Sequence, residues 1–128
     1  MRLIIFLAVW SIASLTSSQV IAEGSVTVEW APFIVKEGVT SERLLVAAQN
    51  VENGFLNKQK GYLKRSLLKG KDGSWVDLVY WQSEADANAA VSAAYESPIC
   101  FEYFALMQSA ENSEVSDVQH FEVVKTWD

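Results

Sequence analysis

Two residue types that often carry protein chemistry are nearly missing from this sequence. Cys100 is its one cysteine, and His120 is its one histidine. A single cysteine excludes a disulfide framework and a zinc site built from several thiolates, and a single histidine excludes the zinc motifs that need two. Positive charge is also scarce, because 10 Lys and Arg face 16 Asp and Glu, for a net charge of -6. The chain therefore lacks the basic surface with which a general nucleic-acid binder displaces phosphate counterions.

Apolar residues, in contrast, are abundant. Half of the 128 residues are hydrophobic and 12% are aromatic. That proportion is far too high for a disordered chain. The length fits one domain, since domains cluster at about 100–150 residues. We therefore expect a single folded unit.

Residues 1–22 have the pattern of a secretory signal peptide. Arg2 supplies the positive start, an apolar run follows from Leu3 to Leu15, and Val20-Ile21-Ala22 places small residues where signal peptidase cuts. An uncleaved anchor is the alternative, because the uncharged stretch 3–22 is about long enough to span a bilayer. The polar end of this stretch favours cleavage. We expect a single domain of residues 23–128 that is periplasmic or secreted and has left the membrane after cleavage.

The remaining sequence predicts the element order β-α-β-β-α-β. β-rich patterns cover residues 25–35, 62–69, 74–82 and 115–127. One helix is expected from Thr40 or Ser41 to Lys58, and a second is capped by Ser83, interrupted at Pro98 and continued over 99–108. This order is typical of an α+β, ferredoxin-like fold, in which one antiparallel sheet carries the helices on one face.

Both faces of the predicted sheet carry large apolar side chains. In the third strand Trp75, Val79 and Trp81 alternate with Val76, Leu78 and Tyr80. A sheet with one solvated face alternates polar and apolar residues more cleanly. Because the helices cover one face only, a second copy of the sheet is the economical cover for the other. The pattern predicts a homodimer.

Several segments resemble the antibiotic biosynthesis monooxygenase (ABM) family of the dimeric α/β-barrel superfamily. They are Gln59-Lys60-Gly61-Tyr62, Trp81-Gln82-Ser83-Glu84-Ala85-Asp86-Ala87 and Gln119-His120-Phe121-Glu122-Val123. The resemblance implies a pocket between the sheet and the helices. Some members of this family oxygenate polycyclic phenols without a cofactor, and others degrade haem.

The resemblance argues against the haem branch. Its members carry an axial His near the position of Phe104 and an Asn on the first strand, where this sequence has Glu29 and Trp30. Neither predicted helix contains a histidine. The resemblance thus implies no metal and no prosthetic group. Trp81 matches the Trp at the end of the third strand in both branches.

The candidate catalytic residues are His120 and Asp77. An imidazole is the side chain best suited to proton transfer near neutral pH. A carboxylate among apolar residues must find a donor, and Asp77 could orient His120 if the two strands place both on one side. The alternatives are a histidine hydrogen-bonded within the sheet and an aspartate at an interface rim.

The candidate binding residues are aromatic: Trp81, Tyr80, Trp30 and Phe104. Packing in the core or in a dimer interface is the alternative. Cys100 is expected to be a buried thiol. We expect an exported protein that binds a small aromatic or lipophilic molecule, with cofactor-independent monooxygenation as its leading activity. A non-catalytic ligand-binding or stress-associated periplasmic protein is the alternative, and proton transfer of the isomerase type by His120 is a third hypothesis.

Overall fold

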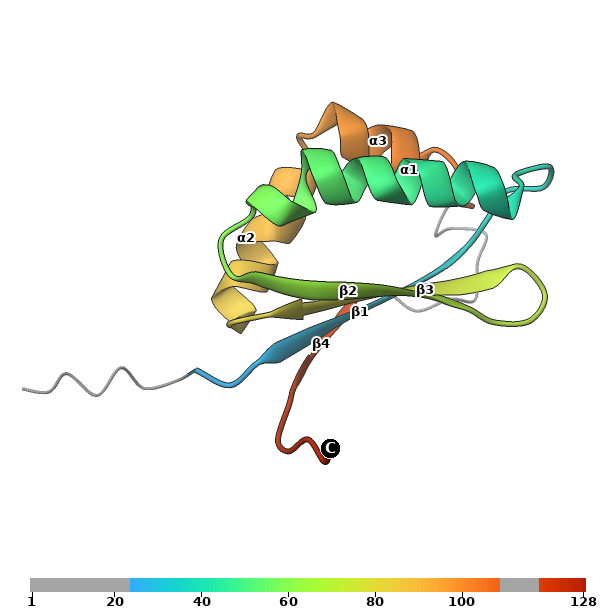
Figure 1. Cartoon of the computed structure of the whole chain (residues 1–128). Helices are drawn as coiled ribbons and strands as arrows, with labels where there is room; N and C mark the ends of the chain where they lie inside the picture. The colour runs from blue at the N-terminus through green and yellow to red at the C-terminus, as the bar shows by residue number, and fades with distance from the viewer. Residues whose placement is uncertain (1–23, 109–117) are drawn as a thin grey trace, which may run out of the picture.

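The expected order of elements is present in the structure. The computed structural model describes residues 24–108 and 118–128 (Figure 1). Its elements are β1 (Thr27–Ile34), α1 (Ser41–Gly54), a short 3-10 helix η1 (Leu56–Lys58), β2 (Tyr62–Lys69), β3 (Ser74–Trp81), α2 (Glu84–Ala94), α3 (Pro98–Phe104) and β4 (Gln119–Glu122). Pro98 separates α2 from α3, as expected. The signal peptide expected over residues 1–22 lies outside the described residues.

The four strands form one antiparallel sheet with the order β2-β3-β1-β4. All three α-helices lie on the same side of this sheet (Figure 1). This arrangement confirms the α+β, ferredoxin-like fold. It also places β2 and β4 at the two edges of the sheet. The first strand of the domain, β1, and the last, β4, lie side by side.

Local signals fixed the starts of the helices and the tight hairpin. The hydroxyl of Thr40 accepts the N–H of Arg43 at 3.2 Å, and that of Ser83 accepts the N–H of Asp86 at 3.1 Å. Both are N-caps that satisfy a helix donor otherwise left free. Asp72 (φ 58°) and Gly73 (φ 75°) take the left-handed backbone of a tight hairpin turn between β2 and β3.

Most predicted boundaries lie within two residues of the observed ones, but those of three elements differ by more. The first helix ends at Gly54 rather than Lys58, because Phe55 leaves the helical region (φ -136°, ψ -66°) and a 3-10 turn follows. The second helical piece ends at Phe104 rather than 108. The last strand, expected over 115–127, spans Gln119–Glu122 among the described residues, because its partner β1 begins at Thr27, opposite Glu122. Residues 115–117 lie outside the described part.

The core lies between the helices and the inner face of the sheet. Along β3, buried residues alternate with half-buried ones, and Trp75, Val79 and Trp81 face inward. They pack with the apolar stripe of α1 formed by Leu44, Ala48 and Val51. This alternation is the one expected from the sequence.

The outer face of the sheet is apolar as well. Cross-strand pairs place Val28 beside Tyr80, Trp30 beside Leu78 and Pro32 beside Val76. Phe121 of β4 joins this face opposite Val28 and is half exposed. We call this apolar surface, made of Val28, Trp30, Leu68, Val76, Leu78, Tyr80 and Phe121, the outer sheet face.

In the described part of the chain no helix is long and apolar enough to cross a membrane.

Gly61 offers a test of how tightly the turn into β2 is built. Its backbone is left-handed (φ 80°), and an added Cβ would collide with the carboxylate of Asp86. Gly38 is also left-handed (φ 83°), but an added Cβ there would meet nothing within 4 Å. Gly61→Ala should lower the free energy of unfolding by about 3 kcal/mol, and Gly38→Ala by about 1 kcal/mol, in urea denaturation. Equal losses would show that the contact with Asp86 is unimportant.

Candidate functional site

A ligand-sized cavity lies between the inner face of the sheet and the helices. Its volume is about 440 Å³, which lies within the range of small-molecule sites. Side chains of β1 and β3 form its floor, and α2 and α3 form much of its wall. Apolar residues dominate the lining, including Phe33, Phe55, Val79, Ala90, Met107 and Val118.

The composition of α2 explains why there is space for a cavity. The residues that this helix turns toward the sheet include Ala90 and Ala94, whose side chains stop at Cβ. Alanine favours the helix strongly but fills little volume. The helix therefore forms beside the sheet without filling the gap between them. Bulkier side chains of α3, among them Phe104, bound the cavity on another side.

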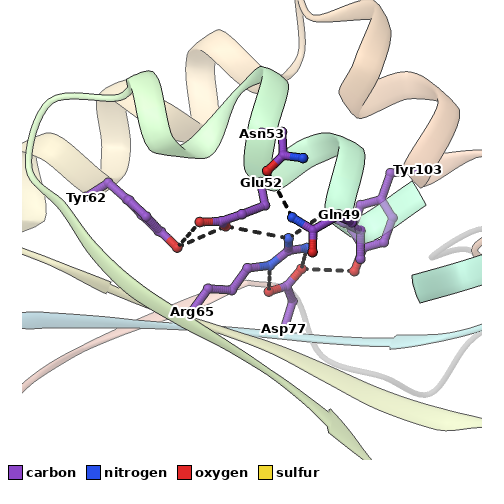
Figure 2. Close-up of polar contacts among 8 residues, drawn as sticks. Gln49, Glu52, Asn53, Tyr62, Arg65, Asp77 and Tyr103 are labelled. Carbon is purple, nitrogen blue, oxygen red and sulfur yellow. Dashed lines mark hydrogen bonds and ion pairs between the residues drawn. The ribbon is translucent and has the colours of Figure 1, made fainter. Parts of the chain in front are cut away.

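Asp77 belongs to a buried ion pair at one side of the cavity (Figure 2). Arg65 Nε donates to Asp77 Oδ1 at 2.7 Å, and Arg65 Nη2 donates to Oδ2 at 2.6 Å. The hydroxyl of Tyr103 donates to Oδ2 at 2.9 Å, and Arg65 Nη1 donates to the carbonyl oxygen of Ala48 at 2.7 Å. Only 8% of the Arg65 side chain and 11% of the Asp77 side chain are exposed. The carboxylate is thus fully occupied by charge-assisted donors.

The pKa values around this pair reflect burial opposed by pairing. Burial alone would lower the pKa of Arg65, but its hydrogen bonds and attraction to Asp77 outweigh that effect and raise it. Burial raises the pKa of Tyr103, and the nearby negative charge of Asp77 adds to the rise. Arg65 therefore stays charged and Tyr103 stays protonated at any physiological pH.

A second carboxylate continues the network toward the surface. The Tyr62 hydroxyl lies 2.7 and 2.9 Å from the two oxygens of Glu52, to which it donates, and Glu52 approaches Arg65 Nη1 at 4.0 Å (Figure 2). The ring of Tyr62 packs edge-on against Trp81, with ring centres 5.9 Å apart. Tyr62 thus connects the network with Trp81, which is 1% exposed and borders the cavity.

Glu29, His120 and Trp81 form a second polar group, here called the orphan cluster. His120 lies directly opposite Glu29 across the β1–β4 pair, and 3.4 Å separates His120 Nε2 from Glu29 Oε2. The two atoms are close enough for an ion pair but are not aligned as a hydrogen bond. Among residues 24–108 and 118–128, neither of these atoms nor Trp81 Nε1 has a hydrogen-bond partner. Each such buried atom costs about 1–3 kcal/mol.

Burial is the main influence on the carboxyl group of Glu29. It raises the pKa of Glu29 above its ordinary range, while attraction to His120 opposes part of the rise. The negative charge of Asp77 adds a smaller rise. Glu29 therefore binds a proton more strongly than an exposed glutamate.

The structure brings only some of the predicted site residues together. Trp81 and Phe104 line the cavity, whereas Trp30 and Tyr80 lie on the outer sheet face, because they sit one residue out of phase with Glu29 and Trp81. The expected pairing of Asp77 with His120 was wrong, since Asp77 pairs with Arg65 and His120 with Glu29. A catalytic role for His120 or Asp77 stays a prediction.

Three residues of the site were not predicted from the sequence: Glu29, Arg65 and Tyr103. Glu29 and Trp30 occupy the region where the haem branch of the ABM resemblance has an Asn, which was the available signal for a polar floor. Arg65 and Tyr103 carried no such signal, because their contacts depend on strand register and on the angle of α3. Cys100 is a buried free thiol at the cavity, as expected, and burial raises its pKa. In the described part of the chain, no three His, Cys, Asp or Glu side chains are grouped to hold a metal ion.

Solved structures with the same fold include oxygenases. SnoaB, a cofactor-independent oxygenase from Streptomyces nogalater, is 18% identical, has a TM-score of 0.60, and matches over 80% of this chain and 97% of its own. A protein from Chloroflexus aurantiacus, provisionally named an antibiotic biosynthesis monooxygenase, is 12% identical with a TM-score of 0.55, over 81% and 98%. NE2512 of Nitrosomonas europaea, of unknown function, is 13% identical with a TM-score of 0.58, over 82% and 95%.

These matches confirm the ABM resemblance at the level of the fold. No family model matches the sequence, and no curated protein does. The chain therefore shares the α+β fold of these solved structures and has a cavity between its sheet and its helices. Its chemistry has to be argued from the cavity and its polar floor.

The ion pair of Arg65 and Asp77 predicts a large effect of one small substitution. Asp77→Asn should lower the free energy of unfolding by about 3 kcal/mol, because it leaves a buried guanidinium without its counter-charge. Tyr103→Phe removes one donor from the same carboxylate and should cost about 1 kcal/mol. Urea denaturation of the two variants checks the difference. A cost for Asp77→Asn no larger than that of Tyr103→Phe would contradict the structural role of the pair.

Proposed function

We propose that this protein binds a small aromatic or lipophilic molecule in its cavity and oxygenates it without a cofactor. The observation that carries the proposal is the combination of apolar walls with a polar floor at Glu29 and Trp81. Ligand sites in proteins have this composition, in which apolar walls hold the ligand and a few polar atoms orient it. The fold shared with SnoaB, a cofactor-independent oxygenase, supports the same class of activity.

The cavity suits such a reaction on physical grounds. Its apolar walls keep water from the ligand, which strengthens the polar interactions at the floor. An electron-rich aromatic ligand supplies the electrons that O2 accepts. In the balanced reaction the ligand gains one oxygen atom and loses two hydrogen atoms, which leave with the second oxygen atom as water. The protein then contributes binding, orientation and proton handling.

We further propose that the protein is exported and acts as a homodimer. The signal-like segment 1–22 supports export to the periplasm or the exterior. The outer sheet face supports the dimer, because Trp30 is 37% exposed and Phe121 is 50% exposed on a surface of mostly apolar side chains. Large apolar surfaces of this kind mark interaction sites. In a homodimer packed sheet against sheet, the outer sheet face of each copy would cover the outer sheet face of the other.

Filling the cavity should weaken ligand binding. Ala94 lines the cavity, whereas Ala89 of the same helix is exposed and does not. Ala94→Phe should weaken the binding of naphthalene by about tenfold or more, and Ala89→Phe should leave it unchanged, because only the first substitution occupies the ligand volume. Fluorescence titration measures the affinities.

Oxygen use separates the two functional hypotheses. With 1-naphthol and isotopically labelled O2, an oxygenase should give a product that carries one labelled oxygen atom, and Ala94→Phe should suppress it. Binding without incorporation of label would indicate the non-catalytic binding protein. Absence of naphthalene binding by the unmodified protein would overturn the proposal as a whole.

The dimer should depend on the outer sheet face. Trp30→Glu places a charge among the half-buried residues of this face and should yield a monomer in native mass spectrometry, because an unpaired buried carboxylate is costly. Val46→Glu, on the exposed side of α1, is the control and should leave a dimer. An unmodified protein that is monomeric would contradict the proposed assembly. The same spectrum reports whether residues 1–22 have been removed.

A further inference from the structure

The orphan cluster contains the polar atoms that the fold itself does not explain. Around Asp77 every strong donor has an acceptor, because Arg65 and Tyr103 donate to the Asp77 carboxylate and Arg65 also donates to the backbone carbonyl of Ala48. Around Glu29, by contrast, the described residues leave Glu29 Oε2, His120 Nε2 and Trp81 Nε1 without hydrogen bonds. Buried polar groups are nearly always paired, and exceptions usually mark a functional site. Glu29 and Trp81 both belong to the lining of the cavity, which is mostly apolar and also includes Asp77, Tyr103 and Gln108.

The types of these atoms define the group that would satisfy them. The indole nitrogen of Trp81 can only donate, and an ionised Glu29 can only accept. A hydroxyl group does both at once, because its O–H can point to Glu29 while its oxygen accepts from Trp81. A ligand with an apolar body and a hydroxyl at its buried end therefore complements the walls and the floor together.

We propose that Glu29 is a catalytic residue that accepts the proton of the ligand's hydroxyl group, with His120 as its positioning residue. In this step the O–H bond breaks, the proton forms a bond to a carboxylate oxygen of Glu29, and the electron pair stays on the ligand oxygen. Trp81 N–H stabilises the resulting oxyanion. His120 Nε2, 3.4 Å from Glu29 Oε2, is placed to hold the carboxylate in position. The inference rests on the proposed function, since it assumes that the cavity binds a ligand.

Geometry selects Glu29 over the other candidate bases. Asp77 also borders the cavity, but both of its oxygens are engaged by Arg65 and Tyr103. His120 is not among the residues that line the cavity; its contact with the site runs through Glu29. The groups that face Glu29 are His120 from β4, Trp81 and Asp77 from β3, and Asp77 is itself neutralised by Arg65. Burial raises the pKa of Glu29, which makes it a stronger base than an exposed carboxylate.

A pair of matched probes tests the inference on the full protein. Naphthalene has only the apolar body, whereas 2-naphthol adds the hydroxyl, and its ionised form has a distinct absorption band. The unmodified protein should bind both probes and should show the naphtholate band at a pH where free 2-naphthol is neutral. Glu29→Gln should keep the naphthalene affinity within about twofold and should reduce the bound naphtholate at least about tenfold. Glu122→Gln, a carboxyl substitution on β4 outside the cavity lining, should change neither.

His120 is tested by a pH profile. His120→Gln retains a polar side chain but removes the imidazole that attracts the Glu29 carboxylate, so the midpoint of naphtholate formation should rise by about one pH unit or more, a tenfold change in proton affinity. If His120 had only a structural role, its substitution would weaken the binding of both probes equally and leave the midpoint of naphtholate formation unchanged. That result would overturn the positioning role.

Stability measurements test whether the Glu29→Gln protein is folded. A raised pKa means that Glu29 favours the folded state in its protonated form, and this contribution is lost as the pH rises through the raised pKa. Glu29→Gln should therefore be at least as stable as the unmodified protein at pH 8, with a smaller advantage near pH 4. A Glu29→Gln protein that still forms bound naphtholate would overturn the inference while leaving the proposed function intact. Failure of the unmodified protein to bind naphthalene would overturn both.

Discussion

The buried guanidinium of Arg65 connects four elements of this fold. It extends from β2, pairs with Asp77 of β3, and donates to the backbone of α1, while Tyr103 of α3 binds the same aspartate. A buried ion pair is not in itself a strong source of stability, because both charges have lost their water. Its main effect here is on geometry, because a planar guanidinium satisfies all of its hydrogen-bond partners only in one relative arrangement. The distance between helices and sheet, and thus the cavity between them, depends on that arrangement.

The two faces of the sheet serve different purposes because strand residues alternate. On β3 the inward residues Asp77, Val79 and Trp81 reach the cavity, while the outward residues Leu78 and Tyr80 reach the opposite surface. Neither set could take the place of the other, because a register slip of one residue would exchange them. A strand that is apolar on both sides thus contributes to an internal cavity and to an apolar outer surface with only eight residues.

Much of the fold could be predicted from the sequence because its signals are local. The caps at Thr40 and Ser83 and the Asp72-Gly73 turn depend on a few neighbouring residues, so element types and order followed from them. The candidate site depends on contacts across strands. Asp77 was recognised as a carboxylate in need of a donor, but the choice between His120 and Arg65 required the register of three strands. Tyr80 was misplaced for a different reason, since its alternation with Trp81 already put the two on opposite faces.

The pairing of Glu29 with His120 joins the first strand of the domain to the last. β4 pairs with the sheet through β1 alone and over four residues, so fewer hydrogen bonds hold it than hold the central strands. Short edge elements open at a lower free-energy cost than the core. When β4 separates from β1, Glu29 gains water and loses its imidazole neighbour together, and the burial that strengthens it as a base disappears. The basicity of the cavity floor is in this way tied to how firmly the C-terminal strand stays docked.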